Sequence, residues 1–257
     1  MTQNPAAFGA DLPPWPQADF ASFGEVEIKP LPRMRKIAAG YLARNWVMIP
    51  HVTHHDEADV TELERRRKAL SEAQSGVEAT ARLTLLPFLA KAAVAALRAF
   101  PQFNASLDLA SGNIVYKKYF HIGVAVDTPN GLLVPVIRDC DRKSVAEIGR
   151  EIGAMSEKAR AKGLPLAEMS GGCFTISSLG GIGGTAFTPI INAPEVAILG
   201  VCRAQWKPGR GADDAVQWRL MLPLSLSYDH RLINGADAAR FARHLADTLG
   251  VPGPLFD

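Results

Sequence analysis

The stretch "LMLPLSLSYDHRLINGADAARF", residues 220–241, decides the fold. From Leu220 to Tyr228 every second residue is leucine or tyrosine, and methionine, proline and two serines fill the positions between. A strict period of two predicts a β-strand with one face in a hydrophobic core. The residues that follow the strand must then turn, and "ADAARFARHLADTL" predicts a helix after that turn.

His230 stands where this strand ends, between Asp229 and Arg231, and Asn234-Gly235 follows four residues later. A histidine at the end of a core strand has a rigid support and can still reach a cleft. The residues alone leave two interpretations open. In the first, His230 and Asn234 are catalytic. In the second, Asn234-Gly235 only forms a turn and caps the helix that follows.

The rest of the chain mixes strand and helix patterns without regular alternation. We expect strands in 23–30, 50–60, 112–137, 171–179 and 195–201, and helices over 33–45, 61–74, 83–100 and 144–162. Thr61-x-x-Glu64 and Ser144-x-x-Glu147 predict capping boxes, Gly163 a helix C-cap, and Pro129-Asn130-Gly131 a hairpin turn. This pattern predicts an α/β fold, a sandwich with a mixed β-sheet.

Composition narrows the class of protein. The 257 residues are 47% hydrophobic and 21% charged, which is typical of a globular protein. The net charge of +2 does not indicate the large excess of positive charge expected of a nucleic-acid-binding protein. Cys140, Cys173 and Cys202 predict reduced, buried thiols in a cytoplasmic protein.

The N-terminus has no signal-peptide pattern, and we expect no membrane span because the apolar stretch 83–100 contains charged residues. Residues 1–22, with four prolines, predict a stiff linker or arm ahead of a domain over 23–257.

Two candidate motifs are rejected on their surroundings. Gly181-x-Gly183-x-x-Ala186 follows a strand as a dinucleotide fingerprint does, but "FTPIINAP" follows it in place of a helix. We expect these glycines to permit a tight loop close to another part of the backbone. His51-x-x-His54-His55 has no further ligand to complete a metal site, so we expect solvent-facing histidines and no metal.

The stretch "LPLSLSYDHRLINGADAARF" closely resembles the terminal signature of the dihydrolipoyl acyltransferase catalytic domain of 2-oxoacid dehydrogenase complexes. "NWVMIPHVTHHDEADVTELE", "HIGVAVDTPNGLLVPVIRD" and "GGCFTISSLGGIGGTAFTPIINAPEVAILGV" resemble that family in the same order. The last of these is most similar to the acetyltransferases of pyruvate dehydrogenase complexes. The resemblance runs from about Phe23 to the end and implies a fold like that of chloramphenicol acetyltransferase.

The resemblance also implies an enzyme that moves an acetyl group between coenzyme A and a dihydrolipoyl thiol. It assigns His230 as general base, since a thiol with a pKa near ~8.5 must lose its proton to attack at neutral pH. It assigns Ser177, with Ser178 as the less favoured choice, as the hydroxyl that stabilises the tetrahedral oxyanion. Asn234 stands where most members carry Asp, so its role is orientation by hydrogen bonds rather than by charge.

Coenzyme A and a lipoyl group are therefore expected as substrates, with the lipoyl carrier outside this chain and the coenzyme A contact residues unassigned. The resemblance implies at least a homotrimer with sites between subunits, and many members of the family assemble trimers further into cubic or icosahedral cores. A lipoyl domain and other complex subunits are the expected partners. We expect either an excised catalytic core or a natural stand-alone protein that takes its acyl carrier from another chain. The alternatives are a stand-alone acyltransferase that uses coenzyme A and another small acceptor, or a non-catalytic scaffold core.

Overall fold

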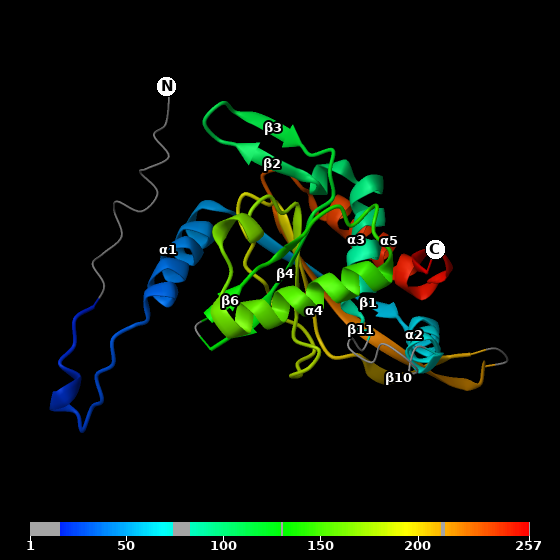
Figure 1. Cartoon of the computed structure of the whole chain (residues 1–257), viewed down its shortest axis with the longest axis horizontal. Helices are drawn as coiled ribbons and strands as arrows, with labels where there is room; N and C mark the ends of the chain where they lie inside the picture. Colours follow the sequence, from blue (N-terminus) through cyan, green and yellow to red (C-terminus); the bar gives the residue numbers. More distant parts are fainter. Residues whose placement is uncertain (1–15, 74–82, 130, 212–213, 257) are drawn as a thin grey trace.

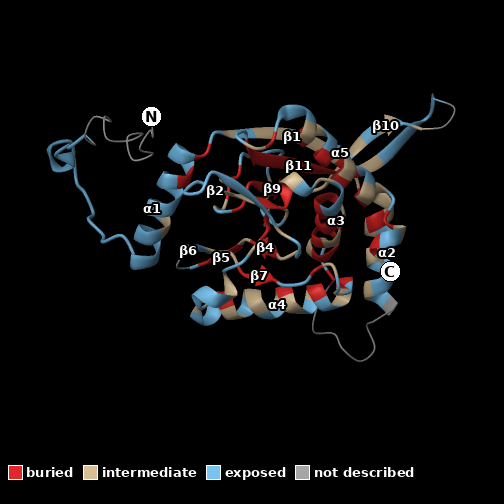
Figure 2. Ribbon diagram, turned by 90° about the horizontal axis from the view of Figure 1, so that it is seen from above, coloured by how far each residue is buried: buried red, intermediate tan, exposed pale blue. Residues whose placement is uncertain are grey.

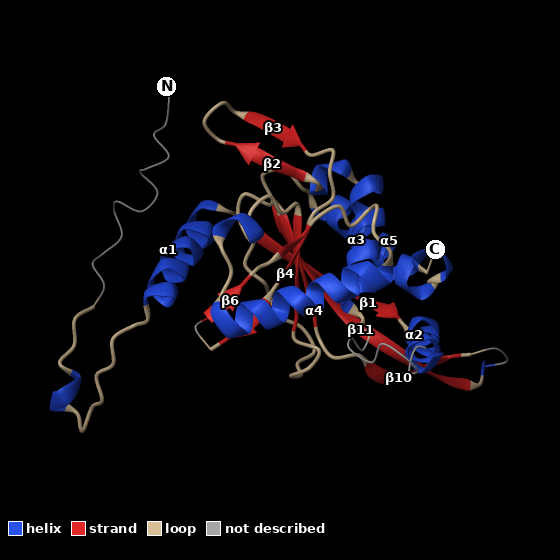
Figure 3. Cartoon of the chain, in the orientation of Figure 1, coloured by secondary structure: helices blue, strands red, loops and turns tan. Residues whose placement is uncertain are grey.

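A computed structural model of the chain describes residues 16–73, 83–129, 131–211 and 214–256. Its centre is a seven-stranded sheet with helices against it (Figures 1 and 3). The strands run in the order β1-β11-β9-β8-β4-β7, with β10 paired to β11. The pairs β4–β8 and β8–β9 are parallel and the others are antiparallel, so the predicted mixed sheet is confirmed.

The strands of this sheet are β1 (His51–Asp59), β4 (Ile122–Val124), β7 (Val136–Ile137), β8 (Phe174–Ser178), β9 (Ala197–Val201), β10 (Gln205–Arg210) and β11 (Val216–Asp229). Two hairpins lie outside it: β2 (Ala105–Asp108) with β3 (Asn113–Tyr116), and β5 (Val126–Thr128) with β6 (Gly131–Leu133). Thr128 pairs with Gly131, so the predicted hairpin is present, although Asn130 lies outside the described residues.

The helices are α1 (Arg33–Met48), α2 (Thr61–Ala73), α3 (Leu86–Ala99), α4 (Val145–Lys162) and α5 (Gly235–Gly250). Short 3-10 turns cover Phe20–Ser22, Pro101–Phe103, Leu166–Glu168 and Gly253–Leu255. The capping box at Ser144 is confirmed, as is the C-cap at Gly163, whose φ of 76° favours glycine. The box at Thr61 is wrong: Thr61 Oγ1 donates to Asp59 and accepts from the Leu220 N–H, so it ties α2 to the sheet.

The main core lies between the sheet and the helices α3, α4 and α5. Figure 2 shows buried residues gathered in the central strands and in α3. On β11 the side chains of Leu222, Leu224, Leu226 and Tyr228 are buried in this core, as the period of two predicts. Burying one such leucine contributes roughly 1.5–3 kcal/mol, so this strand anchors the turn that follows it.

The opposite face of β11 is polar and also buried. Ser225 and Ser227 are fully covered, and their hydroxyls bond to His55 and Thr53 on the neighbouring strand β1. Part of the cover is the loop 179–195, because the ring of Phe187 lies where a side chain on Gly200 would stand, at 2.7 Å from an added Cβ. This close approach explains why β9 carries a glycine there.

The N-terminal arm departs from expectation. Residues 23–30 alternate as a strand would, but the described residues give them no strand partner, and they are exposed. A strand needs a neighbouring strand edge for its backbone hydrogen bonds, and none of the described residues provides such an edge beside 23–30. The helix α1 that follows projects away from the body (Figure 1) and leaves several apolar side chains in solvent: Met34, Ile37, Tyr41, Leu42, Trp46 and Val47.

Candidate functional site

The turn after β11 presents His230 to solvent. Its backbone N–H donates to the Pro50 carbonyl at 3.1 Å, which joins the turn to the start of β1. Among the described residues, neither ring nitrogen of His230 has a hydrogen-bond partner, and the nearest ring, Tyr228, lies 5.8 Å away between centroids. An exposed imidazole with two free nitrogens on a rigid support is able to accept a proton from a substrate.

Two flanking residues hold this turn. The Asp229 carboxylate is buried and accepts from the Arg231 backbone N–H at 3.0 Å, from Nε at 2.9 Å and from Nη2 at 2.6 Å. This hydrogen-bonded ion pair raises the pKa of the Arg231 guanidinium. Sequence reasoning noted both residues beside His230 but assigned neither a role, although a charged pair two residues apart at a strand end was visible in the sequence.

Asn234 is the N-cap of α5. Its side-chain oxygen accepts from the Asp237 N–H at 2.9 Å, and its amide donates to the Asp237 carboxylate at 2.9 Å. No hydrogen bond joins Asn234 to His230 within the part of the chain that the structure describes. In the single chain Asn234 therefore acts on the helix start, in agreement with the cap interpretation.

Ser177 and Ser178 end strand β8. Ser177 is half-buried, and its hydroxyl has no hydrogen-bond partner among the described residues. Ser178 is exposed, and its Oγ accepts from the Gly180 N–H at 3.4 Å within the turn that leaves the strand. Ser177 thus has the freer hydroxyl of the two.

The sheet register keeps Ser177 and His230 apart within one chain. Ser177 pairs with Gly200 on β9, and Gly200 pairs with Ser225 on β11. His230 is five residues after Ser225, just past the end of β11 at Asp229. With a rise near 3.4 Å per residue and strands about 4.8 Å apart, the two residues are about 20 Å from each other. The structure does not bring the two predicted site residues together in one chain.

His51 serves the fold. We predicted that His51, His54 and His55 face solvent, but only His55 is exposed, since His54 is half-buried and so is His51. The Nδ1 of His51 donates to the Ile49 carbonyl at 2.8 Å, its Nε2 accepts from the Ile191 N–H at 3.0 Å, and its ring lies against Trp46. The described residues contain no cluster of three or more His, Cys, Asp or Glu side chains arranged to hold a metal ion.

The glycine-rich segment after β8 is a loop. The described structure has no helix in 179–195, so the rejection of a dinucleotide site is in agreement with the fold. Gly183 and Gly184 adopt φ values of 150° and 85°, which favour glycine in this loop. The expected close backbone approach is wrong for Gly181 and Gly183, because no described atom outside their chain neighbours lies within 4 Å of a Cβ added at either position. The predicted buried thiols are confirmed, and burial raises the pKa of the Cys140 thiol to about 12.

One buried acidic residue was missed by sequence reasoning. Glu195 lies in the loop just before β9 and is 4% exposed. Its Oε1 accepts from the Asn192 amide at 3.4 Å, whereas Oε2 and the nearby Thr175 hydroxyl have no hydrogen-bond partner in the described residues. Burial raises the pKa of Glu195 to about 7, and the nearby Thr175 hydroxyl and the Lys117 ammonium oppose that shift. A glutamate before an apolar strand gives no sequence signal that it will be buried.

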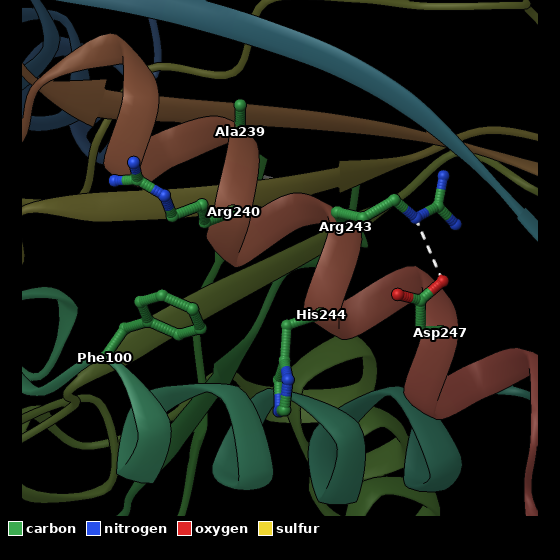
Figure 4. A pocket seen from close by; sticks show the side chains of 6 residues that line it. All are labelled: Phe100, Ala239, Arg240, Arg243, His244 and Asp247. Atoms are coloured by element: carbon green, nitrogen blue, oxygen red, sulfur yellow. Dashed lines mark hydrogen bonds and ion pairs between the residues drawn. The ribbon is translucent and has the colours of Figure 1, made fainter.

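A shallow surface hollow on α5 does not extend the site. Figure 4 shows its lining: Phe100, Ala239, Arg240, Arg243, His244 and Asp247. Arg243 is paired with Asp56 and Asp247, and Arg240 with Asp237, so these cations are already partnered. Neither His230 nor the two serines line this hollow. None of the helices in the described residues is both long enough and apolar enough to cross a membrane.

Comparison with known proteins identifies relatives of this chain. The dihydrolipoyllysine-residue acetyltransferase component of the pyruvate dehydrogenase complex of Cupriavidus necator is 57% identical over 242 residues, which cover 93% of this chain and 42% of the relative. The chain thus spans less than half the length of the curated relatives that it matches first.

Solved structures agree. The dihydrolipoamide acetyltransferase of Azotobacter vinelandii matches with a TM-score of 0.91 and 52% identity, over 95% of this chain and 99% of that one. That study concerned a serine, a histidine and an asparagine in the catalytic mechanism, with the histidine 52 positions after the serine and the asparagine four after the histidine. The cubic core of a pyruvate dehydrogenase multienzyme complex matches equally well, with a TM-score of 0.91.

Chloramphenicol acetyltransferase, at 15% identity and a TM-score of 0.56 over 82% of this chain and 94% of that one, shares the fold, which confirms the predicted fold class. The family model of the 2-oxoacid dehydrogenases acyltransferase (catalytic domain) matches residues 23–256. The chain therefore belongs to the family of 2-oxoacid dehydrogenase acyltransferase catalytic domains.

Proposed function

We propose that the chain transfers an acetyl group between coenzyme A and a dihydrolipoyl thiol, with His230 as the general base. The observation that carries this proposal is the exposed His230 imidazole, free at both nitrogens, at the end of a buried strand in a chain of this family. The acetyltransferase names of its relatives support acetyl as the acyl group.

In the proposed reaction His230 removes the proton from the attacking thiol. The sulfur then adds to the thioester carbonyl carbon, and the negative charge moves onto the carbonyl oxygen. A serine hydroxyl donates a hydrogen bond to this oxyanion. When the tetrahedral intermediate collapses, the carbon–sulfur bond of the leaving thiol breaks, and that thiolate takes back the proton from His230.

Ser177 is our choice for the oxyanion donor, supported by its unpartnered hydroxyl. The spacing in the Azotobacter relative is compatible with either serine. A separation of 52 residues matches Ser178, and it matches Ser177 if the hairpin between β10 and β11 is one residue longer here. Hairpin loops are where such length differences are tolerated. Asn234 follows His230 by four residues, as the asparagine does in that relative.

We propose that the complete site forms between two copies of the chain, in a homotrimer or a larger core. Two observations support this. The register separates Ser177 from His230 by about 20 Å, far beyond the reach of one substrate carbonyl between base and donor. The exposed apolar side chains of α1, which include Tyr41 and Trp46, form the kind of surface that protein interfaces cover.

A lipoyl domain and the other subunits of a pyruvate dehydrogenase complex are the proposed partners. A cytoplasmic location is supported by three buried free cysteines, which suit a reducing compartment. The test is acetyl transfer from acetyl-CoA to dihydrolipoamide by the purified chain. Transfer to other small thiols, alcohols or amines alone would support the stand-alone alternative, and no transfer to any acceptor would support the scaffold.

A further inference from the structure

The turn that carries His230 is held from three sides. The Asp229 N–H donates to the Val196 carbonyl at 2.8 Å, which fixes the turn to β9. The Asp229 carbonyl accepts from the N–H groups of Leu232 and Ile233, which closes the turn. The His230 N–H donates to Pro50, which fixes the turn to β1. These hydrogen bonds all involve the backbone of the turn. The imidazole makes no hydrogen bond within the described residues, so its direction depends on how the backbone of residues 229–233 is held.

The ion pair across His230 differs from the surface pairs of this chain. The Asp229 side chain is 2% exposed and Arg231 is 34% exposed, whereas Arg65 and Glu62 on α2 are 69% and 39% exposed. Exposed pairs contribute little to stability, because water screens them. A buried carboxylate costs free energy unless its oxygens are matched, and here both oxygens are matched by one side chain two residues away.

We propose that Asp229 and Arg231 are positioning residues that hold the His230 imidazole in its working direction. This inference rests on the proposed function, in which His230 is the general base. The Arg231 guanidinium binds Asp229 through Nε and Nη2 at once, so the two side chains form a planar clasp that spans His230. A lysine would keep the charge but lose the two-point geometry.

The decisive variant is Arg231→Lys. Displacing a catalytic group by about 1 Å can cost on the order of 100-fold, so we expect kcat to fall roughly 10- to 100-fold with KM within about twofold. Arg65→Lys is the matched control, because Arg65 also binds its carboxylate through Nε and Nη2 but lies on α2. It should keep both kinetic constants and the melting temperature of the wild type.

Arg231→Ala provides the second measurement. Millimolar guanidinium should restore part of its kcat, and sodium chloride at equal ionic strength should not, because only the planar cation can refill the clasp. Recovery by both salts, or by neither, would contradict the positioning role. So would an Arg231→Lys kcat within twofold of the wild type, or a loss that follows melting alone.

Crystal structures of the Arg231→Lys and Arg65→Lys variants distinguish a failure of this inference from a failure of the proposed function. In Arg231→Lys the residues 229–233 should shift or adopt several conformations, and in Arg65→Lys they should superpose on the wild type. If the wild type transfers no acetyl group but the turn shifts as expected, the function fails and the clasp stands. If His230→Ala is inactive while Arg231→Lys is fully active with an unchanged turn, the function stands and the clasp fails.

Discussion

Ser177 and His230 are about 20 Å apart, because Ser177 is level with Ser225 on β11 and His230 follows the end of that strand, five residues after Ser225. A base and an oxyanion donor act on one substrate within hydrogen-bond reach. The two residues can therefore share a substrate only if different copies of the chain supply them.

Mixing two inactive variants tests this arrangement. His230→Ala chains co-assembled in equal amounts with chains that lack the active serine should regain about a quarter of wild-type activity, since each interface draws its two contributors independently. Specific activity of the refolded mixture is compared with each pure variant. An inactive mixture, with mixing shown by mass spectrometry, would place both groups in one subunit.

His230→Ala should lower acetyl transfer by about 10²–10⁴-fold, the usual contribution of a general base. Its melting temperature should stay unchanged, because the exposed imidazole makes no hydrogen bond in the described structure. Steady-state kinetics and thermal melts measure both. His244→Gln is the control, since His244 packs against Phe100 in the α5 hollow, away from the turn. Activity of His230→Ala within threefold of the wild type would refute the assignment.

Ser177→Ala should reduce turnover by about 10²–10³-fold, or roughly 3–4 kcal/mol of transition-state stabilisation, with little change in KM. Ser178→Ala is the matched variant, one residue along the same strand. Its loss should be small because its Oγ serves the local turn through the Gly180 N–H. A larger loss for Ser178→Ala would move the donor by one position.

Asn234→Ala should destabilise the chain by about 1 kcal/mol through loss of the α5 cap, which lowers the melting temperature by about 2–4 °C. Asn234→Ser keeps a capping oxygen at the helix N-terminus without placing a second carboxylate beside that of Asp237, so it should melt like the wild type. Differential scanning calorimetry distinguishes the two variants. If Asn234→Ser loses activity but not stability, the amide also has a role in orienting the site.

Glu195 predicts a pH dependence of stability. Burial raises its pKa from 4.5 to about 7 in the folded chain, so the unfolded chain loses this proton first as pH rises. Stability falls between about pH 4.5 and 7 and then levels off, by on the order of 3 kcal/mol. Glu195→Gln removes this loss, so its free energy of unfolding should exceed that of the wild type at pH 8 and match it near pH 4.5. Urea unfolding at both pH values measures the difference, and equal gains at both would contradict the assignment.

Local patterns were enough to predict many elements of the fold. The alternation from Leu220 to Tyr228 identified β11, and Ser144 with Glu147 identified the start of α4, because both signals involve neighbours in sequence. The alternation over 23–30 predicted a strand that the described residues do not form, because this signal too involves only neighbours in sequence. It describes a side-chain pattern, but a strand also requires a neighbouring strand edge, which none of the described residues provides beside 23–30.

Sequence by itself, through motifs and family resemblance, identified the residues that we propose carry the chemistry: His230 at a strand end, two serines at another, and Asn234 before a helix. Tertiary structure alone decided how they are arranged. The sheet register, set by pairing between distant segments, separates Ser177 from His230. Folding also buries Glu195 and closes Asp229 and Arg231 into a clasp. Register, burial and ion-pair geometry arise from contacts between parts of the chain that no local pattern brings together.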